Sequence, residues 1–170
     1  MSLMTPEARE IKASPKTAFW IAVLLLLLGW GLRLCALNEV PPGWRDDELI
    51  NIHVISGKPL TGQFPLYFTD ASGHEPLYHY LHAAVHAALG FNVLSGHILS
   101  GAFGTLTLAL TYALARRLFS GQTVALIATA AMATSFWSLM YSRTGIRHMS
   151  LPPFAVAIMW LLPIWHCLCS

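Results

Sequence analysis

Four long apolar runs, separated by polar segments, dominate the chain. They cover residues 17–37, 95–118, 123–141 and 151–168, and each is close to the ~20 residues that an α-helix needs to cross a hydrocarbon core. The chain is 55% hydrophobic and only 11% charged, with a mean hydropathy of +0.56. This pattern predicts an all-α integral membrane protein with about four transmembrane helices.

The first apolar run follows a polar segment, residues 1–16, which we expect to be a cytoplasmic tail. Basic residues before an apolar run are also typical of a cleaved signal peptide, but residues 17–37 exceed the ~7–15 apolar residues of such a peptide. We therefore predict an uncleaved anchor whose amino end is cytoplasmic. Arg33, near its outer end, is expected to snorkel to the membrane surface or to reach a phosphate.

Residues 38–94 form a long polar loop in which two short helices are predicted. Asp46 is a suitable N-cap for a helix over residues 47–56, and the loop over residues 60–73 contains proline and glycine but little periodicity. Residues 76–90 form a second, amphipathic helix, which is short for a membrane span. We expect this helix to lie in the membrane interface.

The amphipathic helix carries leucine on one side and histidine on the other. We expect its histidine face to be in contact with water, and this face contains His79, His82 and His86. A haem or metal site is the alternative, in which His82 and His86 at i and i+4 would be ligands together with further residues. The sequence contains no HExxH motif that would favour it.

The distribution of positive charge predicts the topology. Arg116 and Arg117 follow the second apolar run, and the positive-inside rule places this pair in the cytoplasm if that run crosses inward. Residues 38–94 and 142–150 then lie together on the non-cytoplasmic face, so that acidic and basic residues from two loops can converge. The net charge of +2 is too small to indicate a nucleic-acid partner.

The order of several short motifs resembles a known family. These motifs are Arg-Asp-Asp-Glu-Leu-Ile-Asn at 45–51, Gly-Gln-Phe-Pro-Leu-Tyr-Phe at 62–68, Gly-His-Glu-Pro-Leu-Tyr at 73–78, Phe-Gly-Thr-Leu-Thr at 103–107, Ala-Arg-Arg-Leu-Phe at 115–119 and Ser-Arg-Thr-Gly-Ile-Arg at 142–147. Together they resemble the amino-terminal part of bacterial GT-C glycosyltransferases of the protein O-mannosyltransferase and aminoarabinose transferase type. Members of that family are several times longer, so we expect this chain to be a fragment.

The resemblance implies a partial GT-C fold that transfers a sugar from a polyprenyl-phosphate donor to a protein or glycolipid acceptor outside the bacterial cytoplasmic membrane. The family's catalytic carboxylate corresponds to the Asp47-Glu48 pair, and Glu75 matches an acidic position of the family. Residues expected to bind the donor and its phosphate are Arg143, Arg147, Glu75, His74 and Tyr67.

The chemistry of these residue types agrees with that expectation. A carboxylate such as Asp47 can accept the proton of an acceptor hydroxyl, and arginines four residues apart, Arg143 and Arg147, can clamp a phosphate. Tyr67 can stack on a sugar. No metal or other cofactor is required, although a divalent ion bridging Asp47 or Glu48 to Glu75 is compatible with the residue types.

Simpler interpretations stay open for the same residues. The acidic triplet can be a solvated helix start, and the arginines can contact lipid headgroups. The alternative function is a non-catalytic membrane module whose outer loops bind a partner protein. A transporter is disfavoured because the central parts of residues 95–118 and 123–141 carry no ionisable residue.

Overall fold

A computed structural model describes residues 14–169, apart from residues 38, 41, 44 and 71–72. The described chain is helical, with a single isolated β-bridge between Phe68 and His74. Its α-helices are α1 (Pro15–Leu34), α2 (Asp46–Leu49), α3 (Pro76–Leu89), α4 (Val93–Leu118), α5 (Gln122–Thr134), α6 (Phe136–Ser142) and α7 (Leu151–Cys169). The described residues also form a π-helical turn (Ile50–Ile55) and 3₁₀ turns at Pro59–Thr61 and Arg147–Ser150.

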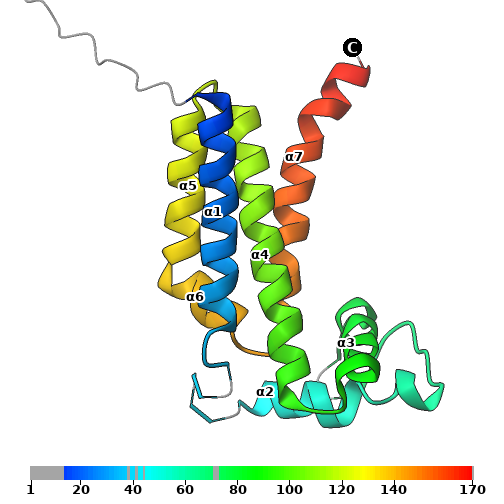
Figure 1. The fold of residues 1–170 in the computed structure, drawn as a ribbon. Helices are drawn as coiled ribbons and strands as arrows, with labels where there is room; N and C mark the ends of the chain where they lie inside the picture. Colours follow the sequence, from blue (N-terminus) through cyan, green and yellow to red (C-terminus); the bar gives the residue numbers. More distant parts are fainter. Residues whose placement is uncertain (1–13, 38, 41, 44, 71–72, 170) are drawn as a thin grey trace, which may run out of the picture.

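The long helices α1, α4, α5 and α7 lie side by side, and the short helices gather at one end of them (Figure 1). α4 is central, because it packs against α1, α5 and α7. Its N-cap is Asn92, whose side-chain oxygen accepts a hydrogen bond of 3.0 Å from the amide of Ser95. The predicted all-α class is confirmed.

Two helices are long and apolar enough to cross a membrane, α1 over Lys16–Leu34 and α4 over Val93–Leu118. α5 and α6 make a third if they count as one span, but they are bent by 57° where Ser135 interrupts them. The span predicted over residues 123–141 thus corresponds to this bent pair, and it is one span only if the two helices are counted together. The fourth predicted span corresponds to helix α7, but the side chains of residues 163–170 are outside the described part, so this span stays a prediction.

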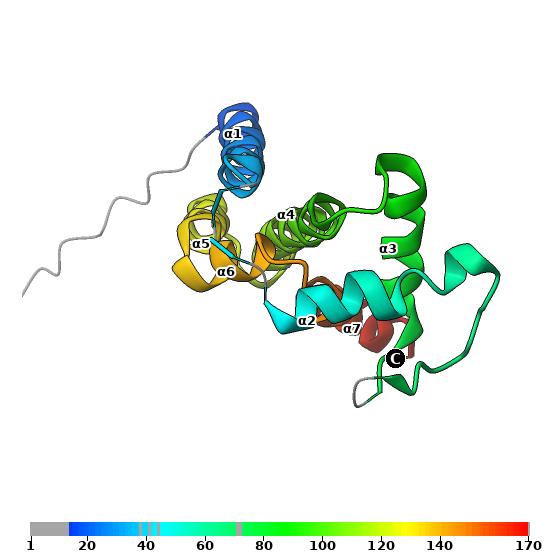
Figure 2. The same cartoon turned by 90° about the horizontal axis from the view of Figure 1, so that it is seen from below.

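Both polar loops lie at the same end of the bundle. The segment from residue 39 to residue 92, with α2 and α3, and the turn at Arg147–Ser150 are at the lower end in Figure 1, whereas α4 ends at the opposite end with Arg116 and Arg117. Seen along the helices, α2 crosses this lower end and α3 lies beside α4 (Figure 2). The expected cytoplasmic tail over residues 1–16 falls largely outside the described residues.

Arg33 does not snorkel. Its side chain is fully buried, and it donates hydrogen bonds to the carbonyl of Gly29 (2.9 Å) and to the hydroxyl of Ser138 on α6 (2.8 Å). A Cβ atom at Gly104 would approach the Arg33 Nε atom to 2.7 Å, so this glycine provides the space for the guanidinium. The expectation failed because the kink before α6 brings a hydroxyl to Arg33 inside the bundle.

The histidine face of α3 is buried, which corrects the expectation that it contacts water. His79, His82 and His86 are at most 2% exposed, whereas Leu77 and Leu89 on the other face are each 51% exposed. The histidine face packs toward α4 and the end of the π-helical turn, where serine hydroxyls contact the rings. The exposed leucine face agrees with a helix in the membrane interface.

Candidate functional site

Glu48 is the centre of a buried group of polar residues at the loop end of the bundle. Its side chain is 1% exposed. One carboxylate oxygen accepts hydrogen bonds from His97 Nε2 on α4 (2.9 Å) and from the amide of Gly145 (2.6 Å). The other oxygen accepts the amide of Arg45 at 3.0 Å, which is the side-chain half of a capping box.

A second contact strengthens the link between the two loops. The amide group of Asn51 donates a hydrogen bond of 3.2 Å to the carbonyl of Gly145, and Asn51 is itself 1% exposed. Gly145 is close-packed, because its ideal Cβ position lies only 3.4 Å from the backbone of Gly96 on α4. We call Glu48, Asn51, His97 and Gly145 the carboxylate cluster. It joins both polar loops to the central helix.

The surroundings of Glu48 favour its ionised form. Burial alone raises the pKa of the carboxyl, but the hydrogen bond and charge of His97 and the amides of Arg45 and Gly145 together hold it below its ordinary value of 4.5. A buried carboxylate with three donors is a stable structural anion. Glu48 is therefore placed to hold the two loops together.

Asp46 and Asp47 differ from Glu48 because both are exposed. The N-cap of α2 is Arg45, and Asp46 is its first helical residue, so the expectation that Asp46 is the cap is off by one position. Both carboxylates lie in the first turn, where the helix dipole favours negative charge. Within the described part of the chain, no hydrogen bond or ion pair engages the side chain of Asp47.

Glu75 and Arg147 meet at the surface of the same end. Arg147 Nη1 lies 2.5 Å from a carboxylate oxygen of Glu75 and also donates to the carbonyl of Gly73 at 3.3 Å. The hydroxyl of Tyr67 covers Gly73, where φ is +90° and an added Cβ would lie 1.8 Å from that oxygen. With His74 between them, these residues form what we call the rim site: Tyr67, Gly73, His74, Glu75 and Arg147.

Arg143 does not join Arg147 in a phosphate clamp. Arg143 is 9% exposed, and its guanidinium donates hydrogen bonds to four backbone carbonyls after and at the end of α1, those of Leu32, Cys35, Ala36 and Val40. A cation is favourable at the carboxyl end of a helix. In this structure Arg143 therefore caps α1, and Arg147 is the accessible cation of the pair.

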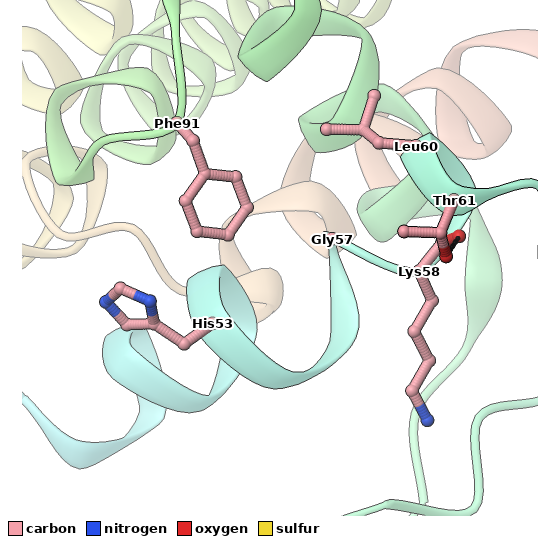
Figure 3. A pocket seen from close by; sticks show the side chains of 6 residues that line it. All are labelled: His53, Gly57, Lys58, Leu60, Thr61 and Phe91. Atoms are coloured by element: carbon pink, nitrogen blue, oxygen red, sulfur yellow. Dashed lines mark hydrogen bonds between the residues drawn. The ribbon is translucent and has the colours of Figure 1, made fainter.

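Cavities of about 430, 450 and 550 Å³ open near these residues, and the smallest of these three is beside Tyr67. One of about 450 Å³ lies between the π-helical turn and the start of α4, lined by His53, Gly57, Lys58, Leu60, Thr61 and Phe91. In Figure 3 the rings of His53 and Phe91 lie together, and Lys58 extends away from them; its ammonium group pairs with Asp70 at 2.5 Å. The second, about 550 Å³, is mostly apolar and is lined by Trp30, Leu34, Ala36, Leu37, Glu39, Leu94 and Ile98.

The predicted site residues thus separate into four places. Asp47 is on the exposed first turn of α2, Glu48 is in the carboxylate cluster, and Arg143 is at the end of α1. The rim site contains the others, which are Tyr67, His74, Glu75 and Arg147. Among the described residues, no group of three or more histidine, cysteine, aspartate or glutamate side chains is arranged to hold a metal ion.

His97 and the amide of Gly145 were missed by the sequence analysis. A signal for His97 exists, because an ionisable residue near the start of an apolar span needs a polar partner. No comparable signal exists for a backbone amide of Gly145, whose role depends on the approach of α2.

Comparisons with known proteins identify no relative of this chain. No protein-family model, no curated protein and no solved structure matches it.

Proposed function

We propose that this chain belongs to a membrane glycosyltransferase that moves a sugar from a polyprenyl-phosphate donor to an acceptor on the non-cytoplasmic face of the bacterial cytoplasmic membrane. The observation that carries the proposal is the joining of the two polar loops. The contact of Glu48 with Gly145 and that of Glu75 with Arg147 hold acidic and basic side chains of both loops at one end of the bundle.

Asp47 is the proposed general base. Its neighbour Glu48 is held by three donors, which fixes the first turn of α2, and the side chain of Asp47 is exposed next to it. An accessible carboxylate on a fixed turn can accept the proton of an acceptor hydroxyl as the new glycosidic bond forms. Glu48 supports the reaction by positioning Asp47.

Arg147 is the proposed ligand of the donor phosphate. Its guanidinium is held by Glu75 and the carbonyl of Gly73 but keeps donors for phosphate oxygens. Tyr67 is 57% exposed at the same rim and can stack on a sugar. The mostly apolar cavity of about 550 Å³ near the end of α1 offers a surface for part of the prenyl chain.

The test is transfer of a labelled sugar from a polyprenyl-phosphate donor in membranes that contain the chain. We expect Asp47→Asn to reduce transfer by a factor of ~10²–10⁴, the range for loss of a general base. Asp46→Asn is the matched control, because Asp46 is also exposed in the same turn, and it should keep most of the activity. Equal activity of the Asp47→Asn and wild-type chains would remove Asp47 from the mechanism.

A further inference from the structure

Helix α6 presents a row of aromatic side chains on its outer face. Phe136, Trp137 and Tyr141 are all exposed, and consecutive ring centroids lie 5.7 and 6.1 Å apart. Trp137 and Tyr141, four residues apart, share one side of the helix. The other side faces the bundle, because the hydroxyl of Ser138 accepts a hydrogen bond from the buried Arg33. α6 is therefore amphipathic, with aromatic rings outside.

The bend before α6 brings this aromatic row to the level expected for lipid headgroups. α5 and α6 are bent by 57°, and α6 lies at the loop end of the bundle, close to the end of α1 (Figure 1). Aromatic side chains with a polar edge are enriched at the two surfaces of a bilayer. Seen along the helices, α6 and α3 lie on opposite sides of α4 (Figure 2), so this row is separate from the rim site at the start of α3.

Arg45 completes a small cavity beside the aromatic row. The cavity has a volume of about 80 Å³, and its lining also includes Met140 and Thr144. Hydrogen-bond donors in the lining are the guanidinium of Arg45, the indole N–H of Trp137 and the phenol of Tyr141. Within the described part of the chain, no hydrogen bond or ion pair engages these three groups. A site built from donors selects an anion with several acceptor oxygens, such as a phosphate.

Two buried cations lie behind α6 and add to the positive charge of Arg45. Arg33 contacts α6 through Ser138, and Arg143 follows the last residue of α6. Their guanidiniums are held by backbone carbonyls and one hydroxyl, and among the described residues neither forms an ion pair with a carboxylate. Neutral partners stabilise a buried cation but leave its charge in place, and that charge is weakly screened where water is excluded. This side of the bundle is therefore positive.

The carboxylates of neighbouring segments do not occupy the cavity. Glu48 is engaged by the donors of the carboxylate cluster, and Glu39 lines a different cavity. Asp46 and Asp47 follow Arg45 in the chain and are exposed, but neither lines this cavity. Exposed charges are screened by the salt of the solution. The balance at the cavity favours an anion.

We propose that the cavity between Arg45 and the aromatic row binds the headgroup phosphate of an anionic phospholipid, in the leaflet at the loop end of the bundle. The phosphate accepts hydrogen bonds from Arg45 and Tyr141, and the exposed rings of Trp137 and Phe136 contact the lipid below its headgroup. A free phosphate ion uses only the donors of this surface, whereas a phospholipid uses the donors and the rings. The contact fixes α6 at the membrane surface, whatever reaction the rim site serves.

The test is photo-cross-linking of the full chain in phosphatidylcholine nanodiscs, with a phosphatidylglycerol probe that carries a diazirine next to its headgroup. Mass spectrometry of the digested protein identifies the labelled residues. We expect this probe to label residues 136–144 about fivefold more than a phosphatidylcholine probe, which is the effect expected from one basic residue near an anionic surface. Equal labelling by both probes, or no labelling of α6 by either, would overturn the proposal.

Variants of Arg45 assign the preference to this cavity. Arg45→Gln removes the charge and should abolish the preference for the anionic probe, whereas Arg45→Lys keeps the charge and should retain most of it. Arg116→Gln is the matched control, because Arg116 is also exposed but lies in the last turn of α4, at the opposite end of the bundle. It should leave the labelling of residues 136–144 unchanged. An undiminished preference in Arg45→Gln, with a wild-type circular dichroism spectrum, would contradict the proposal.

Competition distinguishes a lipid headgroup from a free phosphate ion. Potassium phosphate, compared with potassium chloride at equal ionic strength, should leave the labelling of α6 unchanged, because free phosphate makes no contact with the rings. A loss of labelling that is specific to phosphate would show that the cavity binds the free ion and would overturn the lipid assignment. Sugar transfer is not measured in any of these experiments, so their outcome is independent of the proposed function.

Discussion

The carboxylate cluster and a row of buried histidine and serine side chains are neighbours at one end of the bundle, yet they bury polar groups in different ways. We call this row the histidine chain, and in order it contains His74, His79, Ser56, His82, Ser95 and His86. The cluster buries a charge, and it satisfies Glu48 with donors from α2, α4 and the second polar loop. The histidine chain buries imidazole rings, each paired with a hydroxyl or with another ring. Gly96 separates them, since its Cβ position faces both His82 and Gly145.

The difference concerns what each region can do. A buried carboxylate with three donors keeps its charge, so it fixes the loops to α4 but is not available as a base. Burial lowers the pKa of His79 and of His82, so these two rings are held in the neutral form. The first region therefore buries a charge that joins segments, whereas the second buries uncharged rings that protonation would disrupt.

The largest effect is expected from removing the charge of the cluster. Glu48→Leu would leave His97 and the amides of Gly145 and Arg45 buried without an acceptor, which should cost about 3–5 kcal/mol of unfolding free energy. Denaturant unfolding in detergent, followed by circular dichroism, measures this. Asp47→Leu is the matched control and should change stability by less than ~0.5 kcal/mol, because Asp47 is exposed. Similar losses in both variants would contradict the anchoring role of Glu48.

Acid should destabilise the two regions in different pH ranges. The folded pKa values of His79 and His82 are about 4 and about 3, below the ordinary 6.5, so the unfolded chain binds more protons and stability falls as the pH drops below 6.5. A tenfold difference in proton affinity between the folded and unfolded chains corresponds to ~1.4 kcal/mol. Protonation of the two rings should therefore lower the free energy of unfolding by about a few kcal/mol. Glu48 has a folded pKa below 4.5, and its contribution is lost only below that pH.

Unfolding free energies measured from pH 7 to pH 4.5 therefore report on the histidine chain. His82→Gln should flatten the curve in this range, because it removes one of the two buried rings whose pKa is lowered. A wild-type stability that is constant between pH 6.5 and 4.5 would show that these rings are not buried in the neutral form.

A smaller effect is expected where the two regions touch. Gly96→Ala would place a Cβ atom 3.0 Å from His82 Nε2 and 3.4 Å from the Gly145 backbone, and such overpacking typically costs ~1–3 kcal/mol. Gly31→Ala in α1 is the control, because nothing lies within 4 Å of its Cβ position and alanine favours the helix. If Gly96→Ala unfolded at the same denaturant concentration as Gly31→Ala, the close packing of the regions would be refuted.

The smallest effect is expected at the rim. Glu75 is 72% exposed in its ion pair with Arg147, so Glu75→Gln should cost less than ~1 kcal/mol, and the loss should shrink in high salt. A double-mutant cycle with Arg147→Gln measures the coupling. A coupling above ~2 kcal/mol that is insensitive to salt would place this pair among the buried anchors instead.

Much of the fold was predictable because it depends on local patterns. The apolar runs located α1 and α4, and the proline before the amphipathic segment marked the start of α3 at Pro76. The kink at Ser135 was not predictable, since its sequence is apolar on both sides. Asp47 and Glu48 were predicted as candidates together, but nothing in the sequence indicated which would be buried.

By itself, the amino-acid sequence determined that this chain is helical, that its long helices are apolar and that its acidic residues lie outside those helices. Hydrophobic periodicity and length are sufficient for that, because each helix satisfies its own backbone hydrogen bonds. Only the tertiary structure decided that Glu48 and the histidines of α3 are inside and that Asp47 is outside. Burial of a polar side chain depends on which donors other segments bring to it, and these partners are 49 and 97 residues away from Glu48.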